Sequence, residues 1–242
     1  NGHQAGYRPC GYSSFSYEIT PFLNEPGVEN LLSVTVDNSR QPNSRWYSGS
    51  GIYRNVRLVI TSEVHIPYSG TYVTTPRVEK EKAQVSIRTE IAGATGLEKN
   101  VYLLTKILDP GGKTVAEDCK YVDFEGETDV FVEQSLEVKD PALWDVDNPQ
   151  LYSVESRVLR GSAILDDYRT TFGIRTFRFT ADSGFYLNEK PLKIKGVCMH
   201  HDLGALGTAV NRRAMERQLE ILKEMGCNAI RTSHNPPAPE WL

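Results

Sequence analysis

The sequence is poor in features that mark several large classes of protein. It contains only four cysteines in 242 residues, and no two of them form a CxxC pair, so a zinc knuckle and a thioredoxin motif are excluded. Cysteine is also too sparse for a small secreted scaffold held together by disulfides. We therefore expect the four to be small buried residues: Cys10, Cys119, Cys198 and Cys227.

The chain also lacks long apolar runs and any strong excess of one charge. No apolar run approaches the roughly 20 residues that span a bilayer. The net charge is -4, with Lys+Arg 27 against Asp+Glu 31, which argues against a nucleic-acid coat or a polybasic membrane binder. The hydrophobic fraction of 39% and the charged fraction of 24% are those of a globular protein. The length allows one large domain or two to three small ones.

Residues 1–62 show the alternation of apolar and polar side chains that predicts half-buried β-strands. The pattern occurs over residues 15–20, 32–36 and 53–60. Turn-forming residues separate the first two segments at 24–27. We expect an antiparallel β segment that forms the second half of a sandwich.

Residues 63–178 continue the β pattern, with mostly apolar residues at every second position over 85–91, 101–107, 130–138 and 152–158. Gln134 is the one interruption in the third of these runs. Short strands and turns at this spacing predict an immunoglobulin-like sandwich of about 100 residues. Because the sequence has no Cys…Trp…Cys framework, an antibody-type domain is excluded.

The pattern changes after about residue 179. A hairpin and a strand are predicted over 184–197, with the turn at 188–191. A helix follows, with Asn211 as its N-cap, Gly226 as its C′ residue, and an apolar stripe of Met215, Leu219, Leu222 and Met225. A short strand over 227–231 completes a β-α-β unit, whose two strands lie parallel. The predicted fold class is therefore multidomain, mainly β and then α/β.

Both strands of this unit end in polar residues that can bind a ligand. Met199-His200-His201-Asp202 ends the first strand, and Arg231-Thr232-Ser233-His234-Asn235 ends the second. Because the carboxyl ends of neighbouring parallel strands meet at one edge, we expect the side chains at these ends to form one rim. Two imidazoles, a carboxylate and a guanidinium suit a substrate with many hydroxyls. The side chains concerned are His200, Asp202, Arg231 and His234.

Two other interpretations of these residues stay open. His200 and His201 could belong to a solvated loop, with Arg231 forming an ion pair with Asp202. A metal site is the other alternative, but His200 and His201 on an extended segment point to opposite sides and cannot both bind one ion without a turn. Elsewhere, Trp46 and Tyr47 could stack on a sugar, or else Trp46 and Tyr53 pack in the core, and Trp144 is interpreted as a core or domain-contact residue.

Five motifs in order resemble glycoside hydrolases of family 2, the group of β-galactosidases, β-glucuronidases and β-mannosidases. The resemblance covers nearly the whole chain. Residues 44–54 resemble the end of the family's sugar-binding jelly-roll domain, and residues 141–152 a motif of its immunoglobulin-like domain. Residues 172–175 resemble the last strand before the barrel. The first and second barrel strands correspond to LNEKPLKIKGVCMHHD at 187–202 and NAIRTSHNPP at 228–237.

This resemblance implies three domains: part of a jelly roll at 1–62, an immunoglobulin-like sandwich at 63–178 and the start of a TIM barrel at 179–242. It implies a retaining β-glycosidase, most similar to a β-galactosidase, whose two catalytic glutamates follow later barrel strands and are absent here. His200 and His234 are expected to hydrogen-bond sugar hydroxyls, and Arg231 to orient the nucleophilic carboxylate. Asp202 and Asn235 are second choices for sugar contacts.

The sequence departs from the family pattern at Cys198, where Asn is frequent, and at Asn235, where Tyr is frequent. It also has Asn43-Ser44-Arg45 where some members have an acidic residue before the tryptophan. The expected partner is a carbohydrate, with no nucleic acid and no membrane. No cofactor or metal ligand is assigned, and a bound cation, homo-oligomerisation and the cellular compartment stay open. We expect the chain to be an internal segment of a longer polypeptide; the alternative is a non-catalytic carbohydrate-binding β-sandwich protein.

Overall fold

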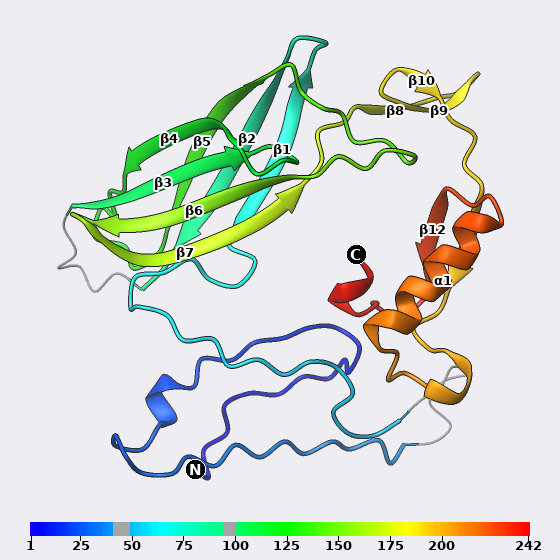
Figure 1. Ribbon diagram of the computed structural model, residues 1–242. Coiled ribbons are helices and arrows are strands. Elements are labelled where there is room, and N and C mark those ends of the chain that lie inside the picture. Colours follow the sequence, from blue (N-terminus) through cyan, green and yellow to red (C-terminus); the bar gives the residue numbers. More distant parts are fainter. Residues whose placement is uncertain (41–48, 94–99) are drawn as a thin grey trace. The chain divides into compact units, whose positions relative to one another are not determined.

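The computed structural model describes residues 1–40, 49–93 and 100–242 (Figure 1). The chain divides into two compact units. One unit combines residues 1–57 with 194–242, and the other consists of residues 58–193.

The unit of residues 58–193 contains a two-layer antiparallel β-sandwich, visible as the cyan-to-yellow strands of Figure 1. One sheet has the order β1-β2-β5, and the other has the order β4-β3-β6-β7. The strands are β1 (Thr71–Val78), β2 (Lys82–Ile91), β3 (Val101–Leu108), β4 (Thr114–Tyr121), β5 (Val130–Lys139), β6 (Tyr152–Arg160) and β7 (Ala163–Phe172). The sandwich predicted from the alternating pattern is confirmed.

The interior of the sandwich holds two apolar clusters. One is built around Ile91, Leu103 and Val158, and the other around Ile87, Ile107 and Val154. Between the clusters, each of four strands places one polar residue at an inward position. These four are all buried: Thr89 on β2, Thr105 on β3, Gln134 on β5 and Ser156 on β6.

Gln134 is therefore part of a buried polar layer. Its Oε1 accepts a hydrogen bond from Thr105 Oγ1 at 2.6 Å. Its Nε2 donates to Asp118 Oδ2 at 3.1 Å. A buried amide is tolerated only when it has such hydrogen-bond partners. Gln134, which interrupts the apolar pattern of β5, finds both partners on the facing sheet.

The segment that leaves the sandwich is fixed against Trp144, which is half-buried. Trp144 N donates to Ile174 O at 2.8 Å, and the Arg175 guanidinium lies 4.8 Å from the Trp144 ring centroid. A Cβ on Gly173 would come within 2.9 Å of Trp144 Cβ. Trp144 is thus a packing residue, and Gly173 is small because the tryptophan occupies the adjacent space.

A small three-stranded antiparallel sheet follows, formed by β8 (Phe177–Thr180), β9 (Gly184–Leu187) and β10 (Lys190–Pro191). Asn188 and Glu189 connect β9 to β10 with φ values of 49° and 62°. Positive φ at both central residues is characteristic of the type I′ turn, a common two-residue hairpin turn. The predicted hairpin is confirmed, with its turn at the start of the expected range.

In the other unit, the β-α-β arrangement is confirmed. Strands β11 (Gly196–Met199) and β12 (Ala229–Thr232) pair in parallel, and α1 (Arg212–Glu224) connects them. Asn211 Oδ1 accepts from Ala214 N at 3.0 Å, and Gly226 has φ 86°. Both helix ends therefore have the predicted caps. Of the predicted apolar stripe, Met215 is buried, whereas Met225 is 65% exposed.

Residues 1–57 contain no β-strand in their described part, so the strands expected over 15–20, 32–36 and 53–60 are a wrong prediction. One short 3-10 helix is present, η1 (Thr20–Phe22). Alternation of side chains permits a strand, but a strand also needs a neighbour to complete its backbone hydrogen bonds. Leu32, Leu58 and Ile60 are exposed instead of lying in a core.

Two further findings concern expectations from composition. No helix among the described residues is long and apolar enough to cross a membrane. The prediction of four buried cysteines is wrong: Cys10, Cys119 and Cys198 are exposed, and Cys227 is half-buried. Cys119 alternates outward on β4, and Cys198 points away from the packed side of β11, so strand context alone did not determine which face each thiol occupies.

Candidate functional site

The carboxyl ends of β11 and β12 lie next to each other. Cys198 is opposite Arg231, and Met199 is opposite Thr232 in the parallel register. His200 follows β11, and His234 lies two residues beyond β12. Their ring centroids are 5.5 Å apart, with the rings at 68° to each other. The structure therefore brings His200, Arg231 and His234 together at one rim.

The two adjacent histidines diverge as the extended backbone requires. His200 approaches His234, whereas His201 turns toward Tyr12 and Asn235. His201 is 6% exposed, and its ring centroid lies 4.7 Å from that of Tyr12 in an edge-on arrangement. Asn235 Nδ2 donates to His201 Nδ1 at 3.1 Å. His201 thus supports the loops from beneath the rim.

Arg231 contacts Cys198 rather than Asp202. Its Nη1 lies 3.7 Å from Cys198 Sγ, and among the residues that the structure describes Arg231 and Asp202 form no ion pair. The Arg231 guanidinium, together with Ser233, lowers the pKa of the Cys198 thiol from its ordinary value. Asp202 is half-buried in the loop that leads to η2 (Gly204–Leu206). The interpretation of Arg231 as the partner of Asp202 is not supported.

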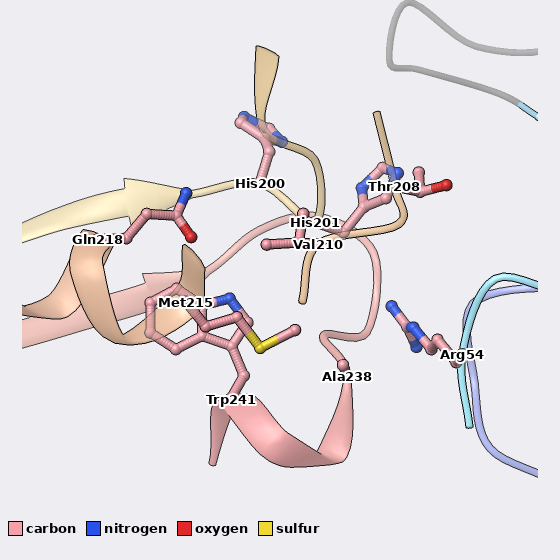
Figure 2. Close-up of a pocket in the computed structure, with 9 residues that line it drawn as sticks. All are labelled: Arg54, His200, His201, Thr208, Val210, Met215, Gln218, Ala238 and Trp241. Carbon is pink, nitrogen blue, oxygen red and sulfur yellow. The ribbon is translucent and has the colours of Figure 1, made fainter. Parts of the chain in front are cut away.

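A small cavity lies behind the rim, and Figure 2 shows its lining. Arg54 lies on the opposite side of it from Met215 and Gln218 (Figure 2). The cavity has a volume of about 20 Å³, which suits a single water molecule. Ligand pockets have volumes of several hundred Å³, so a sugar does not fit inside. Arg231 and His234 are both exposed.

The pattern analysis missed Arg54, Tyr12 and His201. Arg54 donates to backbone carbonyls of Pro236 at 2.8 Å and Pro237 at 3.2 Å, and also to that of Tyr12. Tyr53 OH donates to Gly11 O at 2.9 Å. The bonds from Arg54 to the two prolines join residues more than 180 positions apart, and those to Tyr12 and Gly11 join residues 42 positions apart, so a local pattern could not reveal them. For His201, one signal was available in the sequence: it follows His200 on an extended segment, so its side chain points to the opposite side from that of His200.

A second set of hydrogen bonds holds the 3-10 helix η3 (Pro239–Trp241). Glu240 Oε1 accepts from Asn55 Nδ2 at 2.5 Å and from Arg57 Nη2 at 3.1 Å. Its own backbone amide and these two side chains lower the pKa of the Glu240 carboxyl. The segments 53–57 and 236–240 are therefore joined by both neutral and charged hydrogen bonds.

Two expectations concern other features of the site. Asn43, Ser44, Arg45, Trp46 and Tyr47 lie outside the described residues, so the expected sugar contact of this loop stays a prediction. Within residues 1–40, 49–93 and 100–242, no group of three or more His, Cys, Asp or Glu side chains is arranged to hold a metal ion.

Comparison with known proteins identifies the class. The family model described as glycosyl hydrolases family 2 matches residues 64–175, and the TIM barrel domain model of the same family matches residues 179–242. These adjoining matches define the chain as part of a glycosyl hydrolase. It belongs to glycosyl hydrolase family 2, as the five motifs in the sequence indicated.

Three relatives match all or most of this chain but are much longer than it. A beta-galactosidase of Bacteroides ovatus is 51% identical over 100% of this chain and 28% of the relative. The structure of a beta-glycosidase from Bacteroides vulgatus matches 100% of this chain and 30% of its own, with 37% identity and TM-score 0.85. A Bacteroides uniformis beta-glucuronidase matches 93% and 28%, with 31% identity and TM-score 0.81. The chain spans less than a third of each.

Proposed function

We propose that this chain is a segment of a retaining β-glycosidase that hydrolyses β-galactoside-type substrates. The observation that carries the proposal is the rim at the ends of β11 and β12, where His200 and His234 lie 5.5 Å apart beside Arg231. In a TIM barrel the active site lies at the carboxyl ends of the strands. The match of the barrel model to residues 179–242 supports the proposal that this rim belongs to the active site.

In this proposal the domains are the end of a jelly roll at 1–62, an immunoglobulin-like domain at 63–178 and the start of the barrel at 179–242. A complete barrel needs about 250 residues. The resemblance to the family implies that the two catalytic glutamates follow later barrel strands, so in this proposal no glutamate of these 242 residues takes either role. The relatives, which are more than three times as long as the match, support this assignment.

The rim residues serve the sugar rather than the bond-breaking step. His200 and His234 hydrogen-bond sugar hydroxyls, and these bonds strengthen as charge develops in the oxocarbenium-like transition state. Arg231 orients the nucleophilic carboxylate through charge-assisted hydrogen bonds. Asp202 and Asn235 are secondary sugar contacts. Because Asn235 also donates a hydrogen bond to His201, the residue before Asp202, it supports the loop that carries Asp202 as well.

The choice of galactosides over glucuronides is supported by similarity. A relative named as a beta-galactosidase is 51% identical, whereas a relative named as a putative beta-glucuronidase is 39% identical. A glucuronide differs from a galactoside by the C6 carboxylate and the orientation at C4. An enzyme for glucuronides therefore needs an additional cationic group near C6.

The proposal is tested with the natural full-length polypeptide, as its source produces it, on a panel of p-nitrophenyl β-glycosides. Its intact mass is measured first, and a mass well above 27.2 kDa is expected. We expect hydrolysis of the β-galactoside to exceed that of the β-glucuronide and β-mannoside. Preference for the glucuronide would overturn the substrate assignment. A mass near 27.2 kDa with sugar binding but no hydrolysis would instead support a non-catalytic carbohydrate-binding protein.

A further inference from the structure

Arg54 lies in the N-terminal segment, yet its guanidinium reaches the loop that carries His234. Nη2 donates to Pro236 O at 2.8 Å, and Nη1 donates to Pro237 O at 3.2 Å. Nη1 also donates to Tyr12 O. Arg54 is half-buried, and its guanidinium carbon lies 5.0 Å from the Tyr53 ring centroid. The loop after β12 is thus tied to two points of residues 1–57.

The chemistry of the loop explains why it needs such a tie. Pro236 and Pro237 have no backbone N–H, so this stretch cannot donate the hydrogen bonds that usually fix a loop. Its carbonyls are the groups by which it can be held. Arginine presents five N–H donors in a rigid planar fork, whereas the ammonium of lysine is a single point. One arginine can therefore bridge two successive carbonyls and a third from another segment.

The same contacts close a ring of neighbours around the rim. Arg54 holds Tyr12 through its carbonyl, and the Tyr12 ring packs edge-on against His201. His201 accepts from Asn235, which lies between His234 and the prolines. Arg54 also lines the cavity behind the rim (Figure 2). Displacing Arg54 would therefore free the loop on the side where His234 emerges.

We infer that Arg54 is a positioning residue for His234: it acts on the sugar site by holding the carbonyls of Pro236 and Pro237, without touching the sugar. This inference rests on the proposed β-glycosidase function for its kinetic consequence. Its structural part, that Arg54 orders the loop after β12, does not depend on that function. The two parts can be measured separately.

The kinetic test uses the natural full-length polypeptide and p-nitrophenyl β-galactoside, with Arg54→Gln, Arg54→Lys and the control Arg57→Gln. Arg57 loses the same charge on the same segment but contacts Glu240 instead of the proline carbonyls. Since small misplacements at an active site cost on the order of 100-fold, we expect Arg54→Gln to lower kcat by about 10- to 100-fold. KM should change by less than about 3-fold. Arg57→Gln should leave both near the wild-type values.

A double-mutant cycle with His234→Asn separates positioning from general damage. If Arg54 acts through His234, Arg54→Gln should lower kcat by less than about 3-fold when His234 is already replaced. An equal loss in both backgrounds would overturn the inference. Should Arg54→Gln fail to fold, Arg54→Lys keeps the charge without the fork, and the same non-additivity is expected of it.

Hydrogen exchange of the peptide 232–242 tests the structural part without any substrate. Arg54→Gln and Arg54→Lys should speed exchange there, whereas Arg57→Gln should have a smaller effect. Unchanged exchange in both Arg54 variants would overturn the inference. If the wild-type protein hydrolyses no β-glycoside, the proposed function fails, while faster exchange in the Arg54 variants would still support loop positioning.

Discussion

Asn235 Nδ2 donates a hydrogen bond to His201 Nδ1 across 3.1 Å, and this bond joins the loops that follow two parallel strands. His201 is buried, so the bond satisfies a ring nitrogen that water reaches poorly. Asn235 directly follows His234 in the chain, and His201 lines the cavity behind the rim. The geometry of the rim therefore depends on a residue that is itself turned away from it.

Replacing Asn235 by Ala should loosen these loops. Loss of one partner leaves a buried polar group unsatisfied, which costs about 1–3 kcal/mol. We expect the free energy of local opening of β11 and β12 to fall by that amount in hydrogen-exchange measurements on the 242-residue chain. Asn148→Ala is the control, because Asn148 lies in an exposed loop of the other unit. Equal exchange in both variants would contradict the assigned role.

The polar layer of the sandwich makes a second prediction. Gln134→Leu removes the acceptor of Thr105 Oγ1 and should lower the free energy of unfolding of the sandwich by about 1–3 kcal/mol. Replacing both partners by apolar groups of similar shape can be nearly neutral. The double variant Gln134→Leu/Thr105→Val should therefore be more stable than Gln134→Leu alone in chemical denaturation. A double variant that loses the sum of both single losses would show that the bond is not the reason for the layer.

Gly173→Ala should destabilise the end of the sandwich. The added Cβ would lie 2.9 Å from Trp144 Cβ, closer than side chains tolerate, so Trp144 must shift. Overpacking of this kind costs about 1–3 kcal/mol. Gly11→Ala is the matched control, since a Cβ at Gly11 meets nothing within 4 Å. Equal midpoints for the two variants in thermal unfolding would show that Trp144 moves freely.

Cys198 should react as a thiolate at lower pH than an ordinary thiol. Hydrogen bonding to Arg231 is the largest cause of its lowered pKa, and this bond favours the charged form. In the Arg231→Gln variant the pKa should rise, so the pH profile of iodoacetamide alkylation at Cys198 should move to higher pH. Mass spectrometry of the alkylated peptide gives the rate. Arg57→Gln serves as the control, and a profile that Arg231→Gln leaves in place would refute the contact.

Some of this architecture follows from local sequence pattern. The period-2 alternation located β2, β3, β5 and β6 of the sandwich, because a two-sheet core needs an apolar face on such strands. Asn211 and Gly226 marked the ends of α1 through capping chemistry that operates within one helical turn. The rim was predicted because the ends of parallel strands share an edge, and His200 and His234 are found there together.

Other features depend on contacts that no local pattern contains. The strands expected in residues 1–57 had the right alternation, but pairing is a property of two segments. Arg54 is one polar residue in a segment predicted as strand, and its importance comes from carbonyls about 182 positions later. Gln134 looked like an interruption, and it became intelligible only when Thr105 and Asp118 were seen as its partners.

The most direct test of the account is the effect of His234→Asn on hydrolysis by the natural full-length polypeptide. Removing a hydrogen bond that strengthens in the transition state lowers kcat/KM by a factor on the order of 100 or more. We predict a loss of that size on p-nitrophenyl β-galactoside, with thermal stability close to that of the wild type. Wild-type kcat/KM in His234→Asn would contradict the claim that the rim at the ends of β11 and β12 binds the sugar.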